Sequence, residues 1–121
     1  MPHLTIEYSS NLSAAITPVL LRAVNHALLG TGQFEEADIK SRALPFDCFA
    51  VGTKDSPRGF VAARLAMLSG RSAEVKRDTA NALLAVLEAA ITAGELELQI
   101  SVEILDIDRD SYAKTLIPHT A

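Results

Sequence analysis

Two different spacings of apolar residues divide this chain into segments and predict its elements. In residues 4–8 every second residue is apolar, which is the period of a strand with one buried face. Over residues 17–30 apolar residues recur every three or four positions, as in an amphipathic helix, and Thr17 followed by Pro18 suits its first turn. The segment from about 38 to 49 is strand-like again, so the first half predicts a strand, a helix and a strand.

The second half of the chain repeats this order. Residues 60–68 form an apolar strand, and Ser72 suits the N-cap of a long helix that Ala93-Gly94 closes. Residues 95–104 alternate most regularly and predict a last strand. The chain is therefore expected to be a single α+β domain over residues 1–121. Its parts are a β-α-β unit at about 2–50, a second unit at about 59–106 and a C-terminal arm at 107–121.

The duplicated β-α-β unit predicts how these elements are arranged. In each unit the strands on either side of the helix lie parallel, joined by a right-handed crossover. The two units together form a four-stranded mixed sheet with both helices on one face. We expect the uncovered face to carry enough Leu, Ile and Val to need a partner, so a closed homo-oligomer is the expected assembly.

Composition and charge restrict the kind of protein this is. The chain has a formal net charge of −4 and no run of Lys or Arg, which argues against a nucleic-acid partner. No apolar stretch is long enough to span a membrane, and the N-terminus lacks the pattern of a secretory signal. Cys48 is the only cysteine, so neither an internal disulfide nor a zinc site is expected. These features predict a cytoplasmic protein without a bound metal.

Pro2 is the first candidate for chemistry. It follows Met1 and is small enough for the methionine to be removed during synthesis, which would leave a secondary amine at the head of the first strand. Such an amine can be a general base at neutral pH if its surroundings lower its pKa. Proline in this position usually has no such role, so this hypothesis depends on the rest of the chain.

Three cations are candidates for binding an anion. Lys40 and Arg42 are two residues apart in a predicted strand, so their side chains leave the same face and mark either a solvated edge or an anion site. Arg71 precedes a helix N-terminus, where free N–H groups favour anions. His3 is expected on the sheet face opposite Pro2, in a structural role.

Three features together resemble the tautomerase superfamily, which includes 4-oxalocrotonate tautomerase and macrophage migration inhibitory factor. They are Pro2 opening a strand, the duplicated β-α-β order, and Gly70-Arg71-Ser72 at a strand-to-helix turn. Short members carry both the proline and the Gly-Arg-Ser turn in one unit, whereas here the first half keeps the proline and the second keeps the turn, as in fused members. With Met1-Pro2-His3 and Ile39-Lys40-Ser41-Arg42, the chain is similar to the 5-carboxymethyl-2-hydroxymuconate Δ-isomerase family.

This resemblance implies an activity and its residues. The family is trimeric, needs neither metal nor coenzyme, and acts in homoprotocatechuate (4-hydroxyphenylacetate) breakdown by a 1,3-proton shift in an unsaturated carboxylate. Pro2 would be the general base, and Arg71, Arg42 and Lys40 would bind substrate carboxylates. Lysine at position 40 keeps the charge of an arginine but not its bidentate fork.

Two other functions remain open at this stage. One is a different tautomerase chemistry, such as keto–enol conversion of a phenylpyruvate-like acid, hydrolytic dehalogenation or decarboxylation. The other is a non-catalytic ligand-sensing domain, because ferredoxin-like β-α-β pairs often serve regulation. Whether Arg64 contacts substrate, and which subunit supplies each cation, also remain open.

Overall fold

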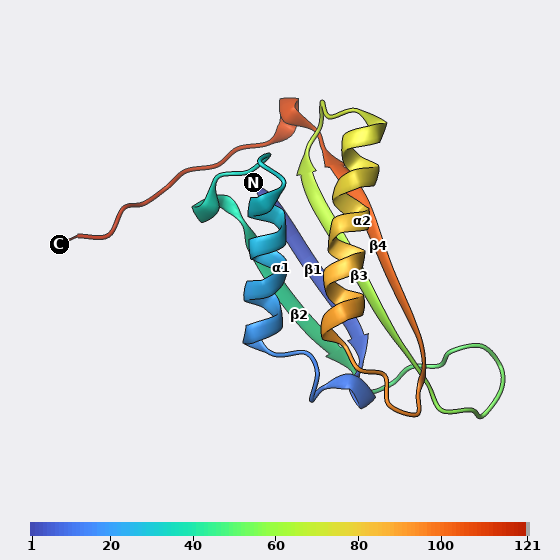
Figure 1. The fold of residues 1–121 in the computed structure, drawn as a ribbon. Helices are drawn as coiled ribbons and strands as arrows, with labels where there is room; N and C mark the ends of the chain where they lie inside the picture. The colour runs from blue at the N-terminus through green and yellow to red at the C-terminus, as the bar shows by residue number, and fades with distance from the viewer. Residues whose placement is uncertain (121) are drawn as a thin grey trace.

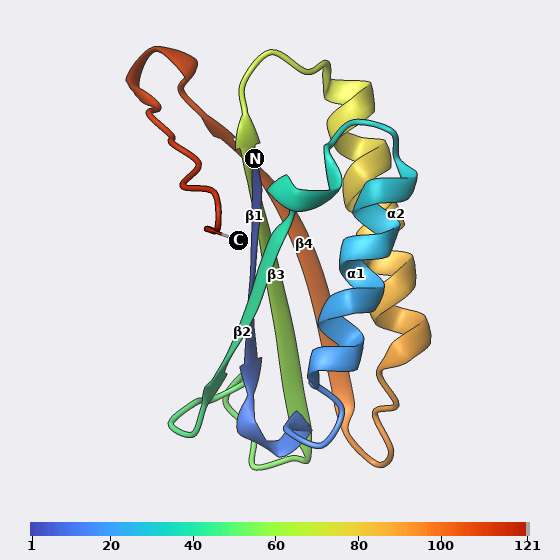
Figure 2. The ribbon, with the colours of Figure 1, turned by 90° about the vertical axis from the view of Figure 1, so that its left-hand side faces the viewer.

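A four-stranded sheet carries both helices on one of its faces (Figures 1 and 2). The structure is a computed structural model that describes residues 1–120. Its elements are β1 (Pro2–Ser9), α1 (Pro18–Gly30), β2 (Lys40–Phe46), β3 (Arg58–Leu68), α2 (Ala73–Ala90) and β4 (Glu97–Ile107), with short 3₁₀ turns at Ser10–Leu12, Glu36–Asp38 and Arg109–Ser111.

The order of strands in the sheet is β2-β1-β3-β4. Within each half the two strands are parallel, and the halves meet through the antiparallel pair β1 and β3. This arrangement confirms the predicted fold class. It also brings the first residues of β1 and β2 to the same end of the sheet as the last residues of β3 and β4, because Pro2 pairs with Met67 and Met67 pairs with Asp106.

Both helices begin where the sequence predicts. The Thr17 hydroxyl accepts from the Leu20 amide at 3.4 Å, and the Ser72 hydroxyl accepts from the Val75 amide at 3.2 Å, so each helix has a side-chain N-cap. Helix α2 ends at Ala90, earlier than the predicted Ala93-Gly94. The reason is Ile91, whose backbone is already extended and whose side chain is buried in the core.

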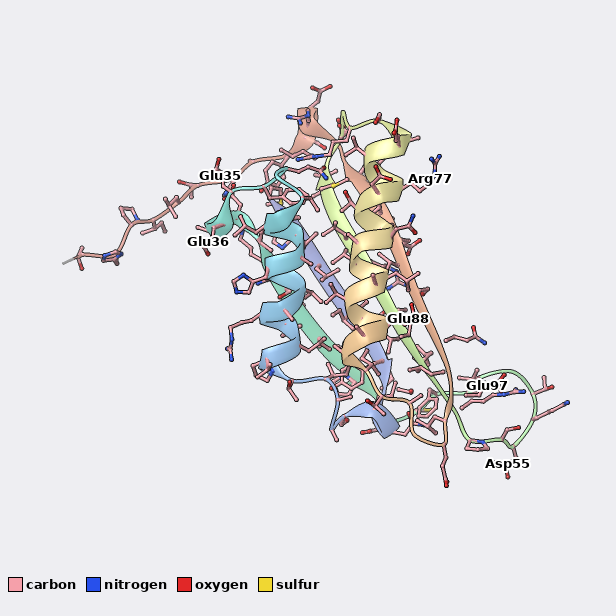
Figure 3. The ribbon with its side chains drawn as sticks, viewed as in Figure 1. Glu35, Glu36, Asp55, Arg77, Glu88 and Glu97 are labelled. Carbon is pink, nitrogen blue, oxygen red and sulfur yellow. The ribbon has the colours of Figure 1, made fainter. Side chains whose placement is uncertain are left out.

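The core lies between the sheet and the helices. Alternate residues of the central strands point toward α1 and α2 and are buried, as the period of two predicts. The most deeply buried apolar side chains are Leu4 and Ile6 of β1, Val61, Leu65 and Met67 of β3, Val24 and Leu28 of α1, and Leu83 and Leu87 of α2. Charged residues such as Arg77 and Glu88 project from the outer side of α2 into solvent (Figure 3).

The face of the sheet away from the helices is more polar than expected. The expectation of a face rich in Leu, Ile and Val was wrong because alternation sends most of those residues to the helix side. The open face instead mixes charged residues with a few apolar ones, of which Leu44 is 53% exposed and Leu105 is 42% exposed. An apolar surface alone therefore does not explain an oligomer.

An ion-pair network crosses three strands on this open face. Arg64 of β3 pairs with Glu7 of β1 and, at 2.8 Å, with Glu103 of β4. The hydrogen bonds that Arg64 donates to these two carboxylates raise its pKa above the ordinary value. The guanidinium is thus engaged within the chain, away from the helix-bearing side.

Candidate active site

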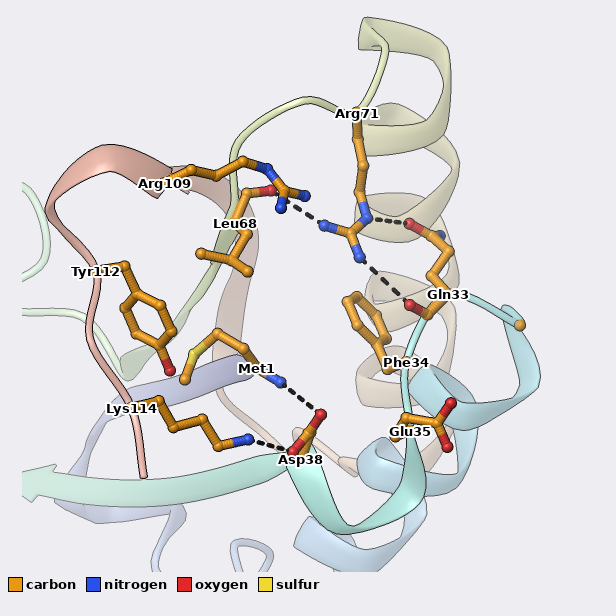
Figure 4. A pocket seen from close by; sticks show the side chains of 11 residues that line it. Met1, Gln33, Phe34, Glu35, Asp38, Leu68, Arg71, Arg109, Tyr112 and Lys114 are labelled. Carbon is orange, nitrogen blue, oxygen red and sulfur yellow. Dashed lines mark hydrogen bonds and ion pairs between the residues drawn. The ribbon is translucent and has the colours of Figure 1, made fainter. Parts of the chain in front are cut away.

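A pocket of about 340 Å³ lies at the end of the sheet where β1 begins (Figure 4). Four segments meet there: the N-terminus, the loop after α1, the turn between β3 and α2, and the residues after β4. Its lining residues are Met1, Gly32, Gln33, Phe34, Glu35, Asp38, Leu68, Arg71, Arg109, Tyr112 and Lys114. The volume falls within the usual range for small-molecule sites.

The turn Gly70-Arg71-Ser72 directs an arginine into this pocket. Gly70 has a φ of 117°, which residues with a side chain rarely adopt, so glycine lets β3 turn sharply after its last residue. Ser72 caps α2 directly afterwards. Arg71 lies between this tight turn and the capped start of α2, so its backbone position is determined from both sides.

The guanidinium of Arg71 is also held by its surroundings. Its Nε donates to Gln33 Oε1 at 3.0 Å, its Nη1 to the Leu68 carbonyl at 3.0 Å, and its Nη2 to the Gln33 carbonyl at 3.3 Å. Its Cζ lies 5.0 Å from the centre of the Phe34 ring, within the range of a cation–π contact. The Arg71 charge is therefore fixed in place at the edge of the pocket.

Pro2 is fully buried at the first position of β1 and does not line the pocket, whereas Met1, which is bonded to its nitrogen, does. The Met1 side chain is only 8% exposed, and the Met1 ammonium lies 3.4 Å from Asp38 Oδ2. Burial lowers the pKa of this ammonium below its ordinary value, and the hydrogen bond to Asp38 opposes that shift. Removal of Met1 would therefore free the Pro2 nitrogen and vacate space in the pocket.

Lys40 and Arg42 occupy different places although they leave the same face of β2. Lys40 Nζ donates to the Asp38 carbonyl at 2.9 Å, so it lies next to a residue that lines the pocket. Arg42 contacts the His3 ring on the open face of the sheet and does not line the pocket. Burial lowers the pKa of His3, and the charges of Arg42 and Lys40 lower it further. A single chain therefore places Arg71 in the pocket and Lys40 beside it, whereas Arg42 lies against His3 on the open face of the sheet.

The segment after β4 contributes residues that the sequence analysis missed. Arg109, Tyr112 and Lys114 line the pocket, and the Arg109 Nε donates to the Ser69 carbonyl. Lys114 pairs with Asp38, which lowers the pKa of that carboxyl and raises the pKa of the lysine. The sequence did contain a signal for this site. Arg109 and Lys114 lie on either side of Tyr112, just after a strand that was predicted to end beside the turn at Gly70.

The charges of the pocket suit an anionic ligand. Arg71, Arg109 and Lys114 contribute positive charge, against the carboxylates of Glu35 and Asp38. Asp38 and Lys114 pair with each other and offset one another's charge, so the positive excess comes from Arg71 and Arg109 against Glu35. Among residues 1–120 no cluster of three or more His, Cys, Asp or Glu side chains could hold a metal ion. None of the helices described within that range is long and apolar enough to cross a membrane.

A duplicated β-α-β sheet with a cationic pocket where a proline opens β1 defines a protein of the tautomerase class. A family model described as 5-carboxymethyl-2-hydroxymuconate isomerase matches residues 2–120. The chain belongs to this family and is an isomerase of the tautomerase superfamily.

Solved structures share this fold. The chain is 36% identical to a 5-carboxymethyl-2-hydroxymuconate isomerase from Deinococcus radiodurans R1, with a TM-score of 0.86 over 94% of this chain and 88% of that one. It is 22% identical to a 5-carboxymethyl-2-hydroxymuconate delta-isomerase, with a TM-score of 0.75 over 96% and 88% of the two chains. It is 16% identical to a fused 4-OT wild-type symmetric trimer, with a TM-score of 0.70 over 93% and 90%. No curated protein sequence matches it.

Proposed function

We propose that this protein moves a proton within 5-carboxymethyl-2-hydroxymuconate in homoprotocatechuate degradation in the cytoplasm, with Pro2 as general base. The observation that carries the proposal is that buried Pro2, at the head of β1, and the fixed charge of Arg71 lie at the same end of the sheet, beside one pocket. The matching family model and the Deinococcus structure support the choice of substrate.

The chemistry divides between one base and several cations. After Met1 is removed, the Pro2 nitrogen takes a proton from the substrate and returns it at another carbon, which completes a 1,3-proton shift. Arg71 binds a carboxylate and stabilises the negative charge that develops between the two proton transfers. A substrate with several carboxylates needs further cations, and Arg109, Lys114 and Lys40 lie at this end of the sheet.

Activity on a panel of acids tests this proposal. We expect protein without Met1, verified by intact mass, to isomerise 5-carboxymethyl-2-hydroxymuconate faster than it tautomerises a phenylpyruvate, dehalogenates a halogenated acrylate or decarboxylates malonate semialdehyde. Preference for one of the other acids would replace the substrate assignment within the same superfamily. Binding without turnover of any of them would instead favour a ligand-sensing role.

We also propose that the protein is a homotrimer. Two solved structures with this fold, each a fused 4-OT protein, are symmetric trimers. In a trimer of this chain, we expect the open face of the sheet to contact the neighbouring subunits. Its Arg64 charge is already paired with Glu7 and Glu103 of the same chain, so burying this face leaves no unpaired arginine. After lining the pocket, the end of the arm runs away from the sheet (Figure 1), and on it Leu116 is 81% and Ile117 84% exposed.

Light scattering at micromolar concentration is expected to give the mass of three chains. A homogeneous monomer under those conditions would contradict the trimer. In a trimer, Arg42 on the open face is placed to serve the pocket of a neighbouring subunit. In a monomer it has no such role, and all substrate carboxylates would be bound by cations of the same chain.

A further inference from the structure

Gln33 joins two residues that are far apart in the sequence. Its side-chain Oε1 accepts from Arg71 Nε at 3.0 Å, and its side-chain Nε2 donates to Thr79 Oγ1 at 2.8 Å. Its main-chain carbonyl accepts a second bond from Arg71, from Nη2 at 3.3 Å. Gln33 therefore contacts the guanidinium twice (Figure 4), and its side chain links the guanidinium to the buried Thr79 of α2.

Thr79 determines which way the Gln33 amide points. Thr79 is 1% exposed, and its hydroxyl donates its single proton to the Val75 carbonyl at 2.8 Å. With that proton committed, the Thr79 oxygen can only accept from Gln33, so the NH₂ group of the amide must face Thr79. The carbonyl oxygen of the amide then faces Arg71. The orientation of a pocket arginine thus depends on a buried threonine of α2.

These contacts leave one edge of the Arg71 guanidinium free. Arginine has one N–H on Nε and a pair on each terminal nitrogen. Gln33 and the Leu68 carbonyl use the Nε proton and one proton from each terminal nitrogen. The remaining two donors, one on Nη1 and one on Nη2, are the pair that meets a carboxylate in a two-bond contact. The edge between Nη1 and Nη2 faces Met1 across the pocket (Figure 4).

We propose that Gln33, oriented by Thr79, is a positioning residue that turns the free edge of Arg71 toward the substrate carboxylate. The proposal rests on the function proposed above. Gln33 would not touch the reacting atoms. It would set the affinity for a planar carboxylate by holding the arginine in the two-bond geometry, in place of the rotational freedom that a long side chain otherwise has.

Steady-state kinetics of matched variants test this role. Gln33→Leu removes both side-chain contacts at similar volume. Thr79→Val removes the hydroxyl and keeps the shape, whereas Thr79→Ser keeps the hydroxyl and loses a methyl group. We expect Gln33→Leu to raise KM for 5-carboxymethyl-2-hydroxymuconate by about tenfold, and Thr79→Val by about threefold, with a smaller fall in kcat because Arg71 also stabilises the charge that develops during the reaction. Thr79→Ser should bring KM back toward that of the parent.

The comparison of the two Thr79 variants separates positioning from stability. Thr79→Val loses the two hydrogen bonds of the hydroxyl and Thr79→Ser loses the packing of a methyl group, and unfolding by urea measures the cost of each. A merely structural role would lower kcat in proportion to the folded fraction and would leave KM unchanged. The proposal is overturned if Thr79→Val has the KM of Thr79→Ser, or if Gln33→Leu has the KM of the parent.

The NMR signal of the Arg71 Nε–H gives a readout that needs no substrate. Its assignment comes from its loss in Arg71→Lys. We expect the signal to be protected from solvent exchange in the parent and in Thr79→Ser, and to exchange fast in Gln33→Leu. If the parent turns over none of the tested acids, the proposed function fails, and this signal alone decides the positioning role. An equally protected signal in Gln33→Leu would reject it.

Discussion

Replacing Arg71 with alanine is expected to lower kcat/KM for 5-carboxymethyl-2-hydroxymuconate by roughly 10²–10³-fold. The variant loses a two-bond contact to a carboxylate and a charge that is already oriented before substrate arrives. Orientation matters here because three hydrogen bonds and the Phe34 ring hold the guanidinium in place. A cation fixed in this way loses little rotational freedom when the substrate binds.

The structure adds a cost in stability to this variant. Arg71 is half-buried, and alanine would leave the Leu68 and Gln33 carbonyls without the donor that they have in the parent. Each lost hydrogen bond of this kind typically lowers the free energy of unfolding by about 1 kcal/mol. Arg71→Lys is the matched control because it keeps the charge and loses the fork. We expect Arg71→Lys to recover only part of the loss in kcat/KM. Full activity in Arg71→Ala, with urea unfolding like that of the parent, would make Arg71 an ordinary residue of a helix start.

Arg71 could be found from the sequence because its position is determined locally. Gly70 provides the sharp turn and Ser72 provides the cap, and both signals lie next to the arginine in the chain. The same local logic identified Thr17 as the cap of α1. The start of each helix was therefore predicted to the residue, whereas the end of α2 was not, because the burial of Ile91 ends that helix before Ala93-Gly94.

Arg109 and Lys114 could not be found in this way because their place depends on pairing between distant strands. The arm reaches the pocket because β4 runs parallel to β3 and ends beside it, as shown by the bond from the Ser69 amide to the Ile107 carbonyl at 2.9 Å. An ion pair with Asp38 then holds the arm over the loop after α1. Nothing near position 114 in the sequence indicates Asp38 as its partner.

Arg42 lies on the predicted face of β2 but does not line the pocket. The period of two correctly placed Arg42 and Lys40 on one face of β2, but the pocket lies at the end of the strand. Two residues along a strand span about 7 Å, which separates Arg42 from the pocket while Lys40 stays next to Asp38. The same period also explains the polar open face: alternation that buries one face of β1 and β3 leaves the other face with His3, Glu7 and Arg64.

Blocking the Pro2 nitrogen is expected to lower turnover by roughly 10²–10⁴-fold, the range that a general base contributes. A chain that keeps Met1 has an amide at this nitrogen, with no usable lone pair, and its methionine side chain fills part of the pocket. Pro2→Ala with Met1 removed is the milder matched variant. It places a primary amine at nearly the same position, so we expect it to retain part of the activity.

The pH dependence of kcat/KM distinguishes a base from a binding group at this position. A base acts in its neutral form, so activity should rise with pH through a single ionisation and level off above it. Burial already lowers the pKa of the Met1 ammonium at this end of the chain, and the charges of Lys114 and Lys40 add to that effect. The Pro2 amine should meet the same surroundings after Met1 is removed, so its ionisation should lie below the value of about 8 usual for a chain terminus. Equal turnover by the Met1-bearing and Met1-free proteins, each verified by intact mass, would show that the base is another group.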